Sequence, residues 1–472
     1  MVQVTLSERA GRQGLGKTTS LCPECGRLLE ARTLIDAGRV YIEKTCPQHG
    51  NFRSVVWNDS KLYTESFKYE QPSKKHLIKG YATQVSKGCP HDCGLCAEHR
   101  QHTCFALVEV TNRCNLNCPV CYASANELSP QEPTITELEE RFKFILNSEK
   151  EPPTLQLTGG EPTIRADLAD IVKLGRRLGF IDITLSTNGV ALANDLGLAK
   201  KLAEAGLSEV ALQFDGVTDD VYVKIRGLPL MDTKLKAIEN MKAAGLSIAV
   251  TAVLLPAVNT HQIGDILAFA KTHTLDGVGF SPMAYTGRYP DGGFDPQNRL
   301  TIPDVLGQIE TQTSGELKRS DFVPVPCPDT VCSTMTYAFN TGERLVPLTR
   351  VLDIDSYLNT LLYGERVVEG ELVRNALLNL WSMGAVPGSA KVLQNLCDCS
   401  PQKDLAKKSK CMSIAIHGFQ DPWNIDFDRV KKCCIHIATA DKKLIPFCVY
   451  NNVNRLNPVH EGAKLRELGR SL

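Results

Sequence analysis

The stretch VEVTNRCNLNCPVCYA, residues 108–123, decides how the rest of the chain is interpreted. It holds Cys114, Cys118 and Cys121 in a C-x3-C-x2-C spacing directly after a short apolar run. Cysteine thiolates are the usual ligands of iron–sulfur clusters, so three of them this close together can hold three corners of a four-iron cluster. Because no fourth ligand is obvious nearby, one iron stays open to a group that is not protein. The alternative is a zinc knot or a structural cluster, and the rest of the chain has to decide between these interpretations.

Size and composition set the first limits. The chain has 472 residues, which is enough for two to four domains. Its 53 basic and 53 acidic residues cancel, so no field of one sign favours nucleic acid as a partner. No apolar run is long enough to span a membrane, and we expect a cytoplasmic protein. In a reducing compartment, its 18 cysteines predict metal ligands rather than disulfides.

Residues 107–290 alternate strand-like and helix-like segments, and the triplet follows the first strand-like run. The strand-like runs are 107–111, 154–158, 182–187, 209–215, 247–255 and 277–283. They are rich in Val, Ile and Leu, as buried parallel strands are. The first helix between them has Thr136 and Glu139 at the spacing of a capping box. This alternation predicts an α/β fold with a parallel sheet or barrel over residues 107–290.

Polar residues follow three of these strands where the strands end. Those residues are Gly159, Gly160 and Glu161, then Ser186 and Asn188, then Gln213, Asp215 and Arg226. Ligands in parallel α/β sheets sit beyond the carboxyl ends of the strands, so these positions are the candidate cofactor site. Taken one by one, each also fits an ordinary strand-end turn, because turns favour Gly, Asn and Asp.

A first accessory group of cysteines lies near the N-terminus. It comprises Cys22, Cys25 and Cys46. Two knuckles at this spacing suit zinc or a rubredoxin-like iron, and we assign residues 1–70 to a small metal-binding ribbon. His49 would favour zinc as the fourth ligand, whereas a remote cysteine would permit iron.

Residues 11–18, GRQGLGKT, match the pattern of a phosphate-binding loop. That motif needs a strand before it and a helix after it. Cys22-Pro23 follows within a few residues and is poor helix chemistry. We therefore expect a flexible glycine-rich arm rather than a nucleotide site.

A second C-x3-C-x2-C motif precedes the first strand of the α/β region. It consists of Cys89, Cys93 and Cys96. Cys104 is the candidate fourth ligand, with His99 and His102 as rivals. Four protein ligands would close this cluster and make it structural or electron-transferring, so we interpret residues 71–106 as an auxiliary cluster segment.

The region 291–472 carries further cysteines and no α/β alternation. Cys327, Cys332, Cys433, Cys434 and Cys448 are candidate ligands of another cluster in a C-terminal α+β domain. Buried thiols acting as small apolar groups are the alternative. Cys397, Cys399 and Cys411 receive no role.

The triplet and the Gly-Gly-Glu-Pro motif at 159–162, one βα unit apart, resemble the radical S-adenosylmethionine (SAM) superfamily. The resemblance implies a partial (β/α)6 barrel and a four-iron four-sulfur cluster whose open iron is chelated by SAM. It also implies that the glycine motif binds the amino group of SAM. The other strand-end residues would hold its ribose and carboxylate.

The complete cysteine layout resembles the archaeal tetraether lipid synthase group. Relatives of that group are assigned as methyltransferases of 7,8-dihydro-6-hydroxymethylpterin. The resemblance implies one or two auxiliary four-iron clusters and one mononuclear iron or zinc. It also implies a low-potential donor such as ferredoxin or flavodoxin, and peripheral membrane contact if the substrate is a lipid.

Our leading expectation is a radical SAM enzyme that couples carbon atoms of lipid chains at an unactivated C–H bond. Carbon methylation of a pterin is the alternative. A non-catalytic electron carrier and a peptide-modifying enzyme are two further hypotheses. No catalytic residue is assigned, since Tyr122 and Tyr285 are candidates by residue type alone.

Overall fold

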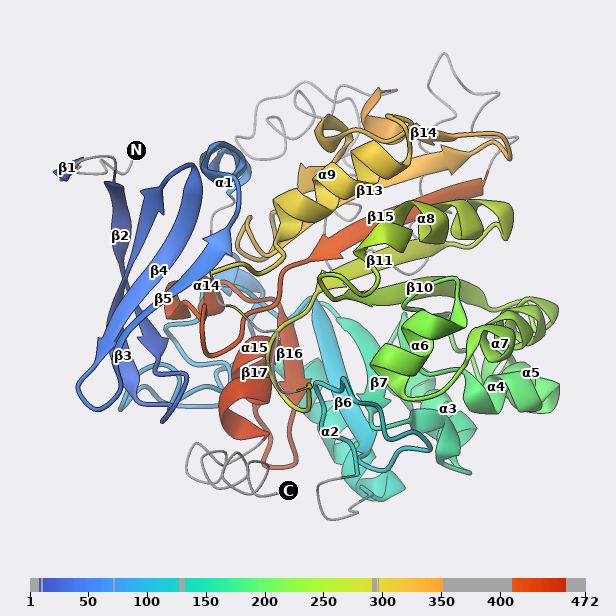
Figure 1. The fold of residues 1–472 in the computed structure, drawn as a ribbon. Helices are drawn as coiled ribbons and strands as arrows, with labels where there is room; N and C mark the ends of the chain where they lie inside the picture. The colour runs from blue at the N-terminus through green and yellow to red at the C-terminus, as the bar shows by residue number, and fades with distance from the viewer. Residues whose placement is uncertain are drawn as a thin grey trace, which may run out of the picture.

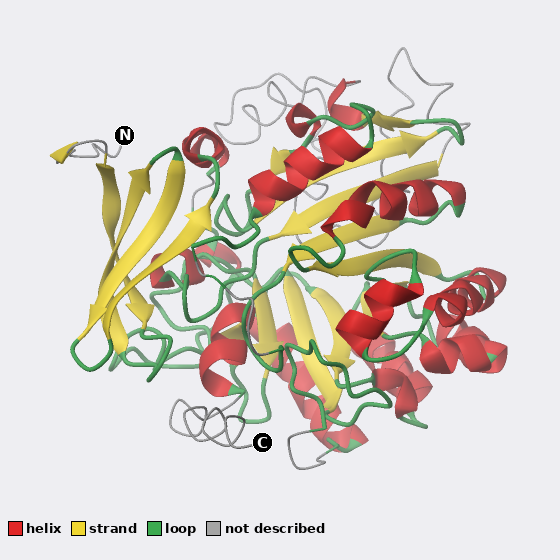
Figure 2. Ribbon diagram, in the orientation of Figure 1, coloured by secondary structure: helices red, strands yellow, loops and turns green. Residues whose placement is uncertain are grey.

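The computed structural model describes residues 8–9, 12–70, 73–126, 132–290, 295, 297–350 and 410–455. Two sheets organise this part of the chain, one of five strands and one of 12 (Figure 1). The smaller sheet is formed by the N-terminal segment and stands beside the larger one. Helices and loops surround the larger sheet (Figure 2). None of the described helices is both long and apolar enough to cross a membrane.

The N-terminal sheet is antiparallel throughout. Its strands are β1 (Glu8–Arg9), β2 (Arg12–Leu21), β3 (Leu28–Asp36), β4 (Arg39–Cys46) and β5 (Gly50–Trp57), paired in that order. Residues 12–18 of the GRQGLGKT segment lie within β2, so the expectation of a flexible arm is wrong. No helix follows it, and the phosphate-loop geometry is therefore absent from this described segment. Helix α1 (Ser60–Ser66) follows the sheet and is capped by Asp59.

All six strands expected in the α/β region form and pair in parallel. They are β6 (Phe105–Thr111), β7 (Thr154–Gly159), β8 (Ile183–Thr187), β9 (Glu209–Gln213), β10 (Ser247–Leu254) and β11 (Gly277–Pro282). The strands follow one another across the sheet in chain order. The prediction of a partial (β/α)6 barrel is therefore confirmed.

The accompanying helices bury one face each against this sheet. They are α2 (Ile135–Ser148), α3 (Leu168–Leu178), α4 (Val190–Asn194), α5 (Leu196–Glu204), α6 (Asp219–Arg226), α7 (Met231–Ala243), α8 (Ile263–Thr272) and α9 (Ile302–Gln312). The capping box of α2 uses Thr134 and Glu137, two residues earlier than predicted. Thr136 and Glu139 have the same spacing as Thr134 and Glu137, so spacing alone does not identify the pair that caps the helix.

Short helical turns connect these elements. They are η1 (Phe67–Tyr69), η2 (Lys75–Leu77), η3 (Pro162–Ile164), η4 (Thr260–Gln262), η5 (Arg319–Asp321), η6 (Leu348–Arg350) and η9 (Tyr450–Asn454). Of these, η3 begins directly after Glu161 and so belongs to the candidate cofactor site.

Strands from the C-terminal region extend the barrel sheet at both edges. They are β12 (Val323–Pro324), β13 (Ser333–Asn340), β14 (Leu345–Pro347), β15 (Lys410–His417), β16 (Ile435–Ala438) and β17 (Leu444–Pro446). Strand β15 pairs in parallel with β11, and β16 pairs in parallel with β6 (Figure 1). Two short helices, α14 (Phe427–Val430) and α15 (Phe447–Val449), flank β16 and β17. The C-terminal α+β segment is thus joined to the barrel by strand pairing. Cys397 and Cys399 lie outside the described residues.

Candidate active site

The loop that follows β6 carries the organising triplet, and a single asparagine holds the start of this loop. Asn126, at φ 72°, accepts a hydrogen bond of 2.8 Å from the Cys114 N–H. Its amide also donates to the carbonyls of Cys114 and Leu116. Asparagine tolerates this left-handed conformation better than most residues. Sequence reasoning missed Asn126, although an Asn shortly after a cysteine loop is the available signal.

The end of the same loop is fixed by Arg288. Cys121 and Arg288 exchange two backbone hydrogen bonds, of 2.8 and 2.9 Å. The Arg288 side chain donates from Nε to the Cys118 carbonyl at 2.7 Å. The loop after β11 therefore clamps the cysteine loop, and Arg288 is a second residue that the sequence did not indicate.

Gly159 and Gly160 allow the loop after β7 to pack directly on the cysteine loop. A Cβ atom on Gly159 would lie 2.0 Å from the Thr111 carbonyl oxygen, and one on Gly160 would lie 2.1 Å from the Arg113 oxygen. Gly159 also has φ +131°, which favours glycine. Two backbone bonds join the loops, from Gly160 N to Thr111 O and from Glu161 N to Arg113 O. The glycines are thus needed for loop–loop packing as well as for the cavity that they line.

Glu161 ties the same loop to the end of β8. Its Oε1 accepts from the backbone and hydroxyl of Thr163 and from the Thr187 hydroxyl. Its Oε2 accepts from the Asn188 N–H at 2.6 Å. Because four donors already use this carboxylate, Glu161 positions neighbouring groups. The Asn188 amide in turn donates to Asn115 in the cysteine loop at 2.7 Å.

Asp215 and Arg226 form a buried ion pair beside the cysteines. Arg226 donates two bonds to Asp215, at 2.7 and 3.0 Å, and a third to the Val120 carbonyl. The Asp215 carboxylate is fully buried and is held behind Arg226, whereas Arg226 lines the cavity. Burial raises the pKa of Cys118, and the Arg226 charge partly offsets this.

Lys234 is a buried cation that the sequence did not single out. Its Nζ donates to the Asn188 carbonyl at 2.6 Å and to Gln213 Oε1 at 2.9 Å. Gln213 also contacts Asp215. Burial lowers the pKa of Lys234 to about 7, although Asp215 opposes the shift. Lys234 is buried on α7, although in the sequence it resembles an ordinary surface lysine.

A cavity of about 380 Å³ lies inside the barrel. The strand-end residues predicted from the sequence line it, except for Asp215. Those lining residues are Cys114, Cys118, Cys121, Gly159, Gly160, Glu161, Ser186, Asn188, Gln213 and Arg226. Strand β15 and α15 also contribute wall residues, including His417 and Phe447. Tyr122 lines the cavity as well, whereas Tyr285 does not.

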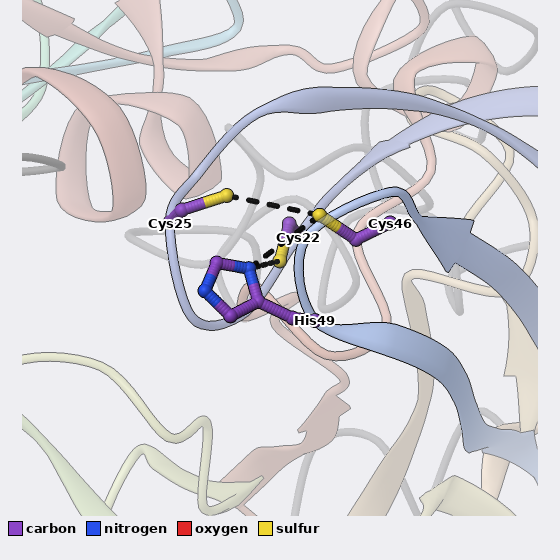
Figure 3. Close-up of side chains that lie close together, drawn as sticks. All are labelled: Cys22, Cys25, Cys46 and His49. Carbon is purple, nitrogen blue, oxygen red and sulfur yellow. Dashed lines mark hydrogen bonds between the residues drawn. The ribbon is translucent and has the colours of Figure 1, made fainter.

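The N-terminal knuckles assemble into a four-residue group (Figure 3). His49 Nδ1 lies 3.6 Å from Cys22 Sγ and 3.5 Å from Cys46 Sγ, and Cys25 Sγ lies 3.9 Å from Cys46 Sγ. A tetrahedral ion with bonds of about 2.3 Å to sulfur and 2.05 Å to nitrogen requires separations of about 3.8 Å between sulfurs. It requires about 3.6 Å between sulfur and nitrogen. The donors fit one zinc ion, with His49 as the fourth ligand.

The structure brings part of the second C-x3-C-x2-C motif together. Cys89 and Cys93 lie 3.6 Å apart. The pKa of Cys93 is raised by the Cys89 thiol, by burial and by the neighbouring Cys96 and Cys433. Cys433 is therefore close to this motif. The structure gathers Cys104, the predicted fourth ligand, with other cysteines instead.

The C-terminal cysteines divide between two places rather than forming one group. Cys327 and Cys434 join Cys104. Burial raises the pKa of Cys433, and the nearby Cys448 and Cys332 thiols add to the shift, so these three cysteines lie near one another. Cys411 is buried within β15.

Comparison with known proteins defines the class of enzyme. The family model of the radical SAM superfamily matches residues 108–270, and that of the HMPTM N-terminal zinc ribbon domain matches residues 14–58. The chain is therefore a radical SAM enzyme. This class implies a four-iron four-sulfur cluster and SAM as cofactors, and the cysteine triplet beside the cavity fits them. The ribbon and the extra cysteines fit further metal sites.

A full-length relative defines the family. The chain is 36% identical to the 7,8-dihydro-6-hydroxymethylpterin dimethyltransferase of Methanocaldococcus jannaschii, over 96% of this chain and 98% of that protein. It belongs to the family of that protein. A probable GTP 3′,8-cyclase of Methanothermobacter marburgensis is 31% identical over 37% of this chain and 55% of its own length. Streptococcus suis SuiB, solved with a precursor peptide, aligns at 15% identity and TM-score 0.37 over 46% of each chain.

Proposed function

We propose that this protein is a radical SAM methyltransferase that acts on a reduced pterin. The proposal is supported by its Methanocaldococcus jannaschii relative, which is named a 7,8-dihydro-6-hydroxymethylpterin dimethyltransferase. The pterin alternative drawn from the sequence thus replaces lipid coupling as the main reading, because the comparisons give lipid coupling no support. One observation carries the proposal within the structure, namely a row of polar side chains deep in the cavity.

The polar row consists of Gln156, Thr184 and Glu209, on three adjacent strands. Gln156 pairs with Thr184, and Thr184 pairs with Glu209, so their Cα atoms follow one line across β7, β8 and β9. All three line the cavity. They lie near the starts of their strands, whereas the cysteine triplet follows the end of β6. The cavity therefore extends from the cluster-binding loop to a polar floor.

The side chains of the polar row can form more hydrogen bonds than they do within the described residues. The Thr184 hydroxyl is buried and has no partner within the described residues. Burial raises the pKa of Glu209 well above its ordinary value, and the negative Asp276 and Asp182 add to the effect. This shift favours the neutral form of the Glu209 carboxyl, which both donates and accepts. Neutral carboxyl, amide and hydroxyl groups together match the alternating donors and acceptors on the amino-oxo edge of a pterin.

A lipid chain does not match this floor. Packing alkyl groups against the row would bury its polar atoms without partners, at a cost of about 1–3 kcal/mol for each group. A pterin satisfies them and places its flat ring against the apolar remainder of the cavity wall. The row thus favours a small heteroaromatic substrate.

The other residues around the cavity hold neighbouring groups in position and place charge beside the cysteine loop. When bound, SAM and its cluster supply a radical that takes hydrogen from an unactivated C–H bond. Asp215 holds the Arg226 guanidinium beside the cysteine loop, and Arg226 lines the cavity, where a carboxylate can accept from it. Lys234 fixes Gln213 and the end of β8. The apolar wall keeps water away from the reacting atoms.

The test compares substrates and one variant under anaerobic conditions with reductant. We expect 7,8-dihydro-6-hydroxymethylpterin to give a product heavier by a methyl group, and a long-chain lipid to give none. Glu209→Leu should raise KM for the pterin by about 10-fold, since loss of one matched hydrogen bond costs about 1–2 kcal/mol. The exposed Glu30→Leu serves as the control. Lipid turnover, or an unchanged KM in Glu209→Leu, would contradict the proposal.

A further inference from the structure

Strand β15 adds a histidine to the cavity at the end of the barrel where the cysteine loop lies. Because β15 pairs in parallel with β11, its carboxyl end lies at the edge where the other barrel strands end. Ser413, Ala415 and His417 line the cavity from alternate positions of this strand. His417 is the last of the three and stands at the carboxyl end of the strand.

Ser333 holds the His417 ring and determines which ring nitrogen carries the hydrogen. The two residues are direct partners in the antiparallel ladder of β13 and β15, and Ser333 Oγ lies 2.9 Å from His417 Nδ1. The Ser333 hydroxyl also donates to the Ile416 carbonyl at 3.2 Å. Because a hydroxyl has one hydrogen and a carbonyl can only accept, both contacts are satisfied when Nδ1–H donates to Oγ.

The other ring nitrogen of His417 is then a hydrogen-bond acceptor. Burial lowers the pKa of His417 to about 4, so the ring is neutral at pH 7 and its Nε2 keeps a lone pair. Within the described residues, Nε2 has no hydrogen-bond partner, although Nδ1 has one. His417 therefore offers the cavity one acceptor with a fixed orientation.

Aromatic rings connect His417 to the cysteine loop. The centroids of the His417 and Phe419 rings are 6.1 Å apart, and those of the Phe419 and Phe447 rings are 4.8 Å apart. The Phe447 ring lies 5.6 Å from that of Tyr122, which directly follows Cys121. These four rings line the cavity and form an aromatic wall. A flat heteroaromatic ring can stack on such a wall, with the Nε2 acceptor at its edge.

The cavity is about one pterin long between the polar row and the level of His417. Glu209, in the row, is the first of three cavity-lining residues on β9, and His417 is the third of three on β15. First and third positions differ by four residues of strand, or about 13 Å at about 3.3 Å per residue. A pterin whose amino-oxo edge binds the row has its 6-hydroxymethyl group at the opposite end. With a hydrogen bond at each end, the molecule spans a comparable length.

We propose that His417 is a specificity-determining residue whose Nε2 accepts a hydrogen bond from the 6-hydroxymethyl group of the pterin. The inference rests on the proposed function and adds the orientation of the substrate. The amino-oxo edge binds the polar row, the ring system lies along the aromatic wall, and the ring that carries the hydroxymethyl group faces the cysteine loop. Ser333 is a positioning residue that fixes the His417 tautomer.

Binding of two pterins that differ in one hydroxyl group tests the proposal. Affinities for 7,8-dihydro-6-hydroxymethylpterin and 7,8-dihydro-6-methylpterin are measured by anaerobic calorimetry on the cluster-loaded protein with SAM and without reductant, so that no turnover occurs. We expect the wild-type chain to bind the hydroxymethyl compound about 10-fold more tightly, because the methyl compound lacks one matched hydrogen bond.

Variants of His417 separate the acceptor from the rest of the ring. His417→Leu and His417→Asn should bind the two pterins equally, because asparagine replaces Nδ1 but does not reach the position of Nε2. His417→Gln, whose amide reaches that position, should keep most of the preference. Ser333→Ala should reduce the preference, because the ring can then adopt either tautomer.

Phe419→Leu is the matched control, since it removes a ring of the aromatic wall and leaves Nε2 in place. It should weaken the binding of both pterins by the same factor, and iron and sulfide should be unchanged in every variant. Equal wild-type affinity for the two pterins, or a preference that survives in His417→Leu, would overturn the role of His417 and leave the pterin substrate intact. If the wild-type chain binds neither pterin, the proposed function fails as well.

Discussion

Replacing Gly160 by alanine should lower activity by about 100-fold, because it forces a displacement of about 0.9 Å between two loops of the site. A Cβ atom at this position would lie 2.1 Å from the Arg113 carbonyl oxygen, whereas real Cβ contacts essentially never fall below 3.0 Å. The difference, 3.0 − 2.1, is a forced separation of about 0.9 Å between the glycine loop and the cysteine loop. The contact is with backbone, so no flexible side chain can relieve it.

The energetic cost follows from the bonds that join the two loops. The separation stretches the bonds from Gly160 N to Thr111 O, 2.8 Å, and from Glu161 N to Arg113 O, 2.9 Å. At about 1 kcal/mol for each bond, their loss costs about 2 kcal/mol locally. A misplacement of about 1 Å in an active site lowers the rate by about 10²-fold. We therefore expect a drop of about 100-fold in the rate of SAM cleavage.

The assay is the formation of 5′-deoxyadenosine from SAM under anaerobic, reducing conditions, with the iron content measured in parallel. Gly80→Ala is the control, because a Cβ atom there meets nothing within 4 Å and its backbone needs no positive φ. The control should keep its full rate. If Gly160→Ala cleaves SAM at more than half the wild-type rate, the loop–loop packing does not position the cofactor.

Three further predictions concern the supports of the site. Glu161→Gln places an amide among four donors, and should lower the melting temperature by several degrees and weaken SAM binding in calorimetry. Arg299→Met leaves the buried Asp421 carboxylate without its partner, and should cost about 3–5 kcal/mol in denaturant unfolding, whereas Arg299→Lys should cost less. Burial lowers the pKa of Lys44 to about 7, so the unfolded chain binds a proton that the native state lacks between that pH and about 10.5. Wild-type stability relative to Lys44→Met should therefore rise by about 2 kcal/mol from pH 7 to pH 9, and a flat difference would contradict this.

Local patterns were sufficient to predict the barrel. The six apolar runs, the cysteine triplet and Gly159-Gly160 are contiguous motifs, and the structure places them where the parallel-sheet rule expects. The predicted capping box of α2 lay two residues too late, because Thr134 with Glu137 and Thr136 with Glu139 have the same spacing. The identity of the strands could therefore be predicted, whereas the exact helix start could not.

The long-range associations could not be predicted. Strand β16 pairs with β6 across more than 300 residues of chain, and no local pattern in 435–438 indicates a partner. For the same reason, Cys104 was assigned to its sequence neighbours rather than to Cys327 and Cys434. Spacing identifies cysteine knuckles, but it does not determine which remote segment supplies the last ligand.

Pterin-dependent cleavage of SAM distinguishes a pterin substrate from a lipid substrate. Anaerobic protein is incubated with SAM and reductant, alone or with 7,8-dihydro-6-hydroxymethylpterin or a long-chain lipid, and 5′-deoxyadenosine is quantified. The account predicts cleavage that accelerates with the pterin, does not respond to the lipid, and is absent in Cys118→Ser. Cleavage that the lipid accelerates and the pterin does not, or that persists in Cys118→Ser, would contradict it.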